Sequence, residues 1–172
     1  MFHILDIDNT LFFTNDLNNK AYIFALSLLG LKALAPCKRI TRMVVASWYP
    51  FLTNAEMTDI VQMKQTYVSE NLHLISINEE LYQLLQEVNA NMVGLWTAAD
   101  PSRIEKILDH NNITDYKHIR FSDKSQDDIC LGIQEFCQIF NCEKDELCFY
   151  EDDRNVITYL QLQGVKVKEV VT

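Results

Sequence analysis

The chain opens with the apolar run Phe2-His3-Ile4-Leu5 and continues directly into Asp6-Ile7-Asp8-Asn9-Thr10-Leu11. The apolar run predicts a buried strand, and ligands bind at the carboxyl ends of strands in open α/β sheets. Residues two apart on a strand face the same side, so Asp6 and Asp8 would repel each other by roughly 4 kcal/mol at about 4 Å. We therefore expect a turn between the two carboxylates or a cation beside them.

The composition is that of a globular chain with one ordinary domain, or a small domain with an insertion. The chain has 172 residues, 48% of them hydrophobic, and a formal net charge of −9. Such an acidic chain lacks the basic face that nonspecific nucleic-acid binding requires, so we expect no nucleic-acid partner. The five cysteines form no CxxC pair and no zinc spacing, which indicates reduced thiols. With no secretory signal and no apolar run long enough to cross a membrane, we expect a cytoplasmic protein.

Helical stripes and strand-like apolar segments alternate from Asn78 to the end of the chain. Asp100 followed by Pro101 is a typical helix start, and Gly164 a typical helix end. Strands are expected at residues 2–5, 92–96, 118–121, 147–150 and 165–171. Because helices separate these strands, the pattern predicts an α/β fold with a doubly wound, Rossmann-like parallel five-stranded sheet.

The segment between the first strand and Asn78 has a different pattern. It shows helical stripes, such as Tyr22, Ala25, Leu26 and Leu29, and no clear strand. We expect a small all-helical cap at residues 14–77, inserted after strand 1 of a core made of residues 1–13 plus 78–172.

Three later strands are each followed by polar residues that suit a binding site. Thr97 follows the strand at 92–96, Lys124 lies between the strand at 118–121 and the next helix, and Glu151-Asp152-Asp153 follows the strand at 147–150. Each is weak evidence alone, because a threonine often ends a strand and an isolated lysine is usually exposed. In a parallel sheet, however, all of them would meet at one edge.

In this order, the four motifs resemble those of the haloacid dehalogenase superfamily of phosphotransferases. Asp6 to Leu11 matches its DxDx(T/V)L signature throughout, and the helical insertion resembles the branch with a cap after the first motif, which includes β-phosphoglucomutase-like proteins and phosphatases. The chain departs from the pattern at Ser125, where these proteins commonly have proline after the lysine. The cap is also short for the group.

The resemblance implies a role for each motif residue. Asp6 would be the nucleophile and Asp8 the general acid/base, since phosphotransferases keep the second aspartate that haloacid dehalogenation does not use. Phosphate would be bound by Thr97, the backbone N–H of Ala98, and Lys124. Mg²⁺ would be bound by Asp6, the Asp8 carbonyl, Asp152 and Glu151, the last directly or through water. The register leaves open whether Glu151 or Asp153 joins Asp152.

These roles predict a Mg²⁺-dependent phosphatase that hydrolyses a small phosphorylated metabolite through an aspartyl-phosphate. A phosphosugar mutase of the β-phosphoglucomutase type uses the same core and is the first alternative. A catalytically silent binding or regulatory protein is the second. Within the cap, Lys38, Arg39 and Arg42 either bind a second anionic group or form a solvated face.

Overall fold

The structure is a computed structural model and describes residues 1–171. It divides into two compact units. The first contains Met1–Phe13 and the chain from Ile77 onward, and the second contains Thr14–Ser76. Each unit has hydrophobic clusters made only of its own residues.

The first unit is built on a five-stranded sheet in the order β5-β4-β1-β6-β7, in which every neighbouring pair is parallel. The strand β1 lies at the centre, and the chain continues to β4 on one side of it and β6 on the other. Such a switch point opens a crevice at the carboxyl ends of the strands. The strands are β1 (Phe2–Leu5), β4 (Val93–Thr97), β5 (His118–Phe121), β6 (Leu147–Glu151) and β7 (Lys166–Glu169). The predicted five-stranded α/β fold is therefore confirmed.

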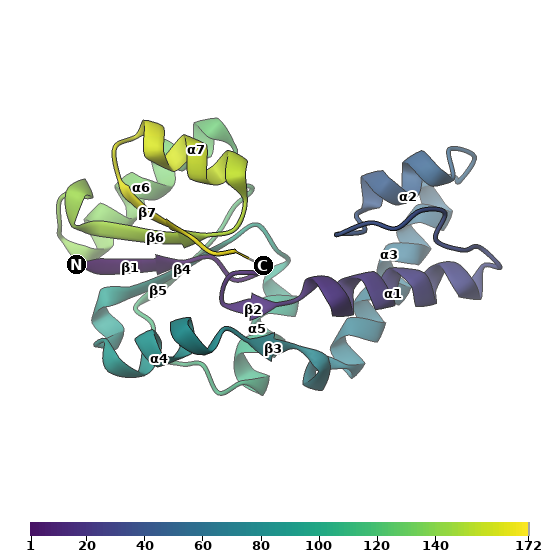
Figure 1. The fold of residues 1–172 in the computed structure, drawn as a ribbon, viewed down its shortest axis with the longest axis horizontal. Helices are drawn as coiled ribbons and strands as arrows, with labels where there is room; N and C mark the ends of the chain where they lie inside the picture. Colours follow the sequence, from purple (N-terminus) through teal and green to yellow (C-terminus); the bar gives the residue numbers. More distant parts are fainter. Residues whose placement is uncertain (172) are drawn as a thin grey trace. The chain divides into compact units, whose positions relative to one another are not determined.

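Helices cover both faces of this sheet, α6 and α7 on one and α4 and α5 on the other (Figure 1). They are α4 (Glu79–Glu87), α5 (Pro101–His110), α6 (Gln126–Phe140) and α7 (Arg154–Leu162), with short 3-10 turns at Ala90–Met92 and Lys144–Glu146. Side-chain oxygens cap three of the four helices: Asn78 accepts from the N–H of Leu81, Asp100 from that of Arg103, and Asp153 from that of Asn155. These caps fix where each helix begins.

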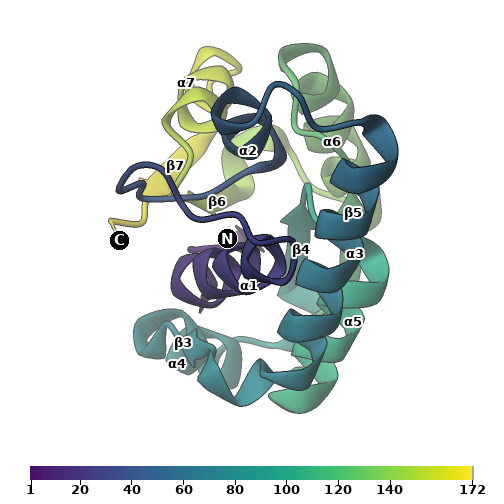
Figure 2. The same ribbon diagram turned by 90° about the vertical axis from the view of Figure 1, so that its right-hand side faces the viewer.

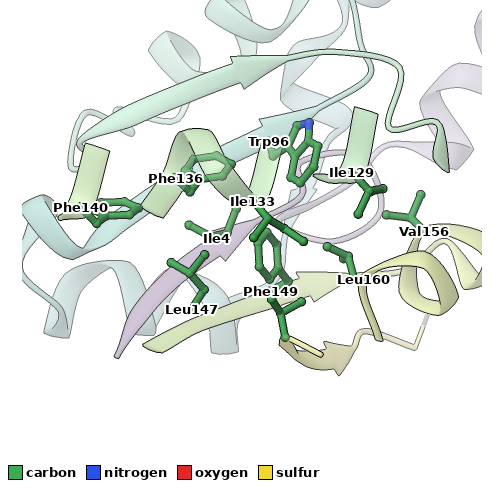
Figure 3. Packing of buried hydrophobic residues seen from close by; sticks show 11 residues of the cluster. Ile4, Trp96, Ile129, Ile133, Phe136, Phe140, Leu147, Phe149, Val156 and Leu160 are labelled. Atoms are coloured by element: carbon green, nitrogen blue, oxygen red, sulfur yellow. The ribbon is translucent and has the colours of Figure 1, made fainter. Parts of the chain in front are cut away.

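An aromatic cluster fills the space between the sheet and α6 (Figure 3). The rings of Trp96 and Phe136 lie 5.8 Å apart between centroids, and Phe149 contacts both. Two glycines make this packing possible, because a Cβ at Gly132 would overlap the Trp96 ring and one at Gly94 would lie 2.7 Å from Phe136 Cε1. The core thus fixes the strand that carries Thr97.

The second unit is helical, as predicted, with α1 (Asn15–Leu28), α2 (Arg42–Trp48), α3 (Asn54–Glu70) and a 3-10 turn at Leu72–Leu74. The helix α1 packs against α3 (Figure 2). Asn19 fastens the loop before α2, since its Oδ1 accepts from Ile40 N at 2.7 Å and its Nδ2 donates to Lys38 O at 3.0 Å. A capping box between Thr53 and Glu56 starts α3.

Two very short strands were not predicted. The strands β2 (Phe12–Phe13) and β3 (Ser76–Ile77) form a separate two-stranded sheet, so the expectation of no strand within residues 14–77 was wrong at Ser76 and Ile77. Two residues are too few to show the alternation by which a strand is recognised. Among the described residues, no helix combines the length and apolar character that crossing a membrane requires.

Candidate active site

The predicted site residues of the first unit come from the carboxyl ends of its strands. Asp6 directly follows β1, Thr97 ends β4 and Glu151 ends β6. The parallel register aligns Leu5 with both Leu95 and Tyr150, so Asp6 and Glu151 lie one residue past this level and Thr97 two residues past it. Asp6, Thr97, Glu151 and Lys124 are all buried although each is polar. Buried polar groups need partners.

Lys124 is the partner that links two of the carboxylates. Its Nζ lies 2.5 Å from Asp6 Oδ1 and 2.6 Å from Glu151 Oε2. The backbone at Lys124 has φ of 53°, a left-handed conformation that few residues other than glycine adopt. Such strain is retained where the surrounding structure determines it, as it does here through two buried ion pairs.

The buried ion pairs shift the pKa values of both partners. Burial lowers the pKa of Lys124, but Asp6 and Glu151 outweigh it and hold the pKa above its usual value. Burial raises the pKa of Asp6 to about 7, against the opposing charge of Lys124 and with a further increase from Glu151 and Asp8. Lys124 therefore stays charged, and Asp6 needs further positive charge to remain fully ionised at neutral pH.

Asp8 is separated from this group by a turn. The chain reverses after Ile7, whose carbonyl accepts from Phe12 N at 2.9 Å, and Asn9 has φ of 62°. The Asp8 carboxylate pairs with the guanidinium of Arg103: Nη1 donates to Oδ1 at 3.0 Å and Nη2 donates to Oδ2. Both a turn and a cation thus reduce the repulsion between Asp6 and Asp8.

Arg103 was not predicted as a site residue, although the sequence carries one signal for it. Arg103 lies in the first turn of α5, two residues after Pro101. A helix N-terminus carries partial positive charge, which disfavours a cation there unless an anion is near. Its anion, Asp8, lies 95 residues away in the chain.

The residues at the centre of the site fit a hard divalent cation. Oxygen atoms of Asp6, Glu151 and Asp152 lie within 4.8 Å of one another. Asp6 Oδ2 is buried and has no hydrogen-bond partner among the described residues. An orphaned carboxylate oxygen inside an all-oxygen cluster is a ligand of the type that Mg²⁺ prefers.

The three consecutive acids have different surroundings. Glu151 is committed to protein contacts, since Oε2 accepts from Lys124 and Oε1 accepts from the N–H groups of Asp152 and Asp153 at 3.1 Å each. Asp153 caps α7, with Oδ1 accepting from Asn155 N at 2.8 Å and Val156 N at 3.3 Å. Glu151 and Asp152 thus belong to the oxygen cluster with Asp6, whereas Asp153 is the N-cap of α7.

The predicted phosphate-binding residues lie at the same edge of the sheet. The Thr97 hydroxyl oxygen accepts from Ala99 N at 3.1 Å, and Ala98 is exposed in the turn between β4 and α5. The loop that carries Lys124 is anchored from β4 as well, because Trp96 Nε1 donates to Ser122 Oγ at 2.7 Å. Ser125 N donates to Asp123 Oδ1 at 3.1 Å, a contact that a proline at this position could not make.

Solved structures of other proteins share this fold. No family model matches the sequence, and no curated protein matches it either. Solved structures do resemble it. A predicted phosphoglycolate phosphatase from Haemophilus somnus 129pt aligns with a TM-score of 0.78 at 15% identity, covering 96% of this chain and 83% of the other. A HAD-superfamily hydrolase of subfamily IA, variant 1, from Geobacter sulfurreducens aligns with a TM-score of 0.72 at 15% identity, covering 96% and 84%.

A third similar structure was solved with a ligand. It is a variant of CbbY from Rhodobacter sphaeroides in complex with xylulose-(1,5)bisphosphate, with a TM-score of 0.74, 15% identity, and coverage of 97% of this chain and 85% of the other. Identities this low establish the architecture rather than the chemistry. The chain therefore has the fold of the haloacid dehalogenase-like hydrolases.

Proposed function

We propose that this protein is a Mg²⁺-dependent phosphatase that hydrolyses a small phosphomonoester through an aspartyl-phosphate on Asp6. The observation that carries the proposal is the state of Asp6: Lys124 holds one buried oxygen at 2.5 Å, and the other buried oxygen has no hydrogen-bond partner among the described residues. A carboxylate held in this way is pre-positioned to act as a nucleophile.

In the first step, an Asp6 carboxylate oxygen attacks phosphorus, and the bond from phosphorus to the leaving oxygen breaks. Asp8 gives its proton to that oxygen, so the product leaves as an alcohol. Lys124 offsets negative charge on the phosphoryl group, and the Thr97 hydroxyl and the Ala98 N–H bind its oxygens. In the second step, Asp8 takes a proton from water, the water oxygen bonds to phosphorus, and the phosphoryl–Asp6 bond breaks to release phosphate.

Mg²⁺, when bound, would supply the positive charge that the phosphoryl oxygens and Asp6 require. Asp6, Asp152, Glu151 and the Asp8 carbonyl are the groups proposed to hold it. The site contains the carboxylates of Asp6, Asp8, Glu151 and Asp152 and the cations Lys124 and Arg103. Its formal net negative charge supports binding of a divalent cation.

A phosphorylated metabolite is the proposed substrate. The complex of the similar CbbY variant with a sugar bisphosphate supports this class without identifying the compound. The helical unit Thr14–Ser76 is proposed to act as a cap that excludes water and contributes to substrate choice. Lys38, Arg39 and Arg42 are exposed in this unit and so are accessible to an anionic group or to solvent.

The test is phosphate release from p-nitrophenyl phosphate and from a panel of phosphorylated metabolites, with Mg²⁺ and after chelation. We expect turnover that requires Mg²⁺ and falls at least about 10³-fold in Asp6→Asn, because the nucleophile is lost. Asp16→Asn, which removes an exposed acid at the start of α1, is the matched control and is expected to retain activity.

The same assay separates the alternatives. Interconversion of hexose phosphates without net phosphate release would replace the phosphatase proposal with the phosphosugar mutase. Normal Mg²⁺ binding without turnover on any substrate would instead favour a catalytically silent binding or regulatory protein.

A further inference from the structure

Arg103 and Asp8 form a two-pronged ion pair beside the proposed nucleophile. Each terminal nitrogen of the guanidinium donates to a different oxygen of the Asp8 carboxylate. The side chains are largely shielded from water, with 16% of Arg103 and 12% of Asp8 exposed. A partly buried bidentate ion pair of this kind, here called the fork, fixes the plane of a carboxylate as well as its position.

Both ends of the pair are anchored in the sheet architecture. Asp8 follows the central strand β1 and forms an isolated bridge with Phe12. Arg103 lies in the first turn of α5, whose start is fixed by the Asp100 cap and by Pro101. Thr97 ends β4, and α5 begins four residues later at Pro101. A proposed phosphate-binding group and the partner of Asp8 therefore lie on either side of one short connection.

The two cations of the site pair with different carboxylates. Lys124 contacts Asp6 and Glu151, whereas Arg103 contacts Asp8. Arginine at the start of a helix is electrostatically disfavoured unless anions lie near, and here both the Asp8 carboxylate and the Asp100 N-cap do.

We propose that Arg103 is a positioning residue that holds the Asp8 carboxyl group in the orientation required for proton transfer to the leaving oxygen. This inference rests on the proposed phosphatase function. A misplacement of about 1 Å in a catalytic group costs up to about 10²-fold in rate, so loss of the fork should be measurable even though Arg103 does not touch the reacting atoms.

The experiment compares leaving groups in Arg103→Gln, Arg103→Lys and the wild type, using p-nitrophenyl phosphate and an alkyl phosphate. The value of kcat/KM covers the steps up to departure of the leaving group, and only the alkyl ester needs a proton for that step. We expect Arg103→Gln to lower kcat/KM by about 10- to 100-fold for the alkyl ester and by less than about threefold for the nitrophenyl ester. Arg103→Lys should fall between Arg103→Gln and the wild type, since it keeps the charge without the fork.

Two further variants make the result specific. Asp8→Asn should show the same dependence on leaving group, and adding Arg103→Gln to it should change kcat/KM by less than about twofold, because the two residues act as one unit. Lys106→Gln removes an exposed positive charge one turn further along α5 and should leave both substrates unaffected. Circular dichroism and the urea midpoint verify that each variant is folded.

An equal loss on both substrates, independent effects of the two substitutions, or an unchanged Arg103→Gln would overturn the inference. If these results occur while the wild type is active and Asp6→Asn is inactive, the phosphatase function stands without a role for Arg103. If the wild type hydrolyses neither these esters nor any metabolite of the panel, the proposed function fails and the role of Arg103 fails with it.

Discussion

Asp152 and Asp153 are adjacent acids whose side chains make different contacts. A carboxylate oxygen of Asp152 belongs to the cluster with Asp6 and Glu151, whereas Asp153 accepts hydrogen bonds from the first N–H groups of α7. We expect Asp152→Asn to raise the apparent Mg²⁺ dissociation constant at least about tenfold. Asp153→Asn should change it by less than about threefold, because asparagine caps a helix as well as aspartate does. Calorimetric titration with Mg²⁺ measures both constants, and an equal effect of the two variants would refute the assignment.

The raised pKa of Asp6 predicts an unusual pH dependence of stability. Burial raises this pKa to about 7, so between about pH 4 and pH 7 the folded protein binds a proton that the unfolded chain has lost. The contribution of Asp6 to stability is therefore present at low pH and is lost as pH rises through about 7, by at most about 4 kcal/mol. A carboxylate stabilised by its ion pair alone would show the opposite pH dependence, because its contribution to stability would grow as pH rises.

Urea unfolding without metal tests this direction. The free energy of unfolding of the wild type minus that of Asp6→Asn should fall between pH 4.5 and pH 7.5, because asparagine does not titrate. Adding Mg²⁺ at pH 7.5 should restore stability in the wild type but not in Asp6→Asn, since binding to the folded state alone stabilises it. A difference that is constant with pH would show that Asp6 keeps an ordinary pKa in the folded state.

At the scale of the elements, prediction succeeded where a pattern is long or is marked at its ends. The helix α5 was recognised from Asp100-Pro101 and its buried stripe of Ile104, Ile107 and Leu108. The short helix α2 and the two-residue strands β2 and β3 span too few residues to show a period. Elements of this length are defined by contacts with distant segments, which a sequence pattern does not show.

The contact between α6 and β4 depends on the absence of a side chain at Gly132. A Cβ there would overlap the Trp96 ring, so Gly132→Ala is expected to destabilise the protein by about 1–3 kcal/mol. Helix propensity alone predicts the opposite sign, because alanine is favoured over glycine inside a helix by roughly 1 kcal/mol. Leu131→Ala, an exposed position on the same helix, should cost less than about 1 kcal/mol. The urea midpoints of the two variants decide between packing and propensity.

For the whole molecule, strand order explains why most of the proposed site could be anticipated. Asp6, Thr97 and Glu151 are far apart in the sequence but each follows or ends a strand, and a parallel sheet aligns those ends. The pairing of Arg103 with Asp8 could not be anticipated in this way, because it depends on how α5 approaches the turn after β1. A pattern thus reveals which edge of the sheet holds the site, whereas the partners of each side chain emerge only from the packing.

Each unit has hydrophobic clusters of its own residues, which predicts that a core substitution acts mainly within its own unit. Ile60 is fully buried in the cluster of α1, α2 and α3, and Leu95 is fully buried in β4. Replacing either with alanine leaves a cavity and should cost about 2–5 kcal/mol. We expect Ile60→Ala to accelerate amide hydrogen exchange in α1 and α3 while β1, β4 and β6 keep their protection, and Leu95→Ala to do the reverse. Equal acceleration throughout both units in either variant would show that the chain unfolds as one cooperative body.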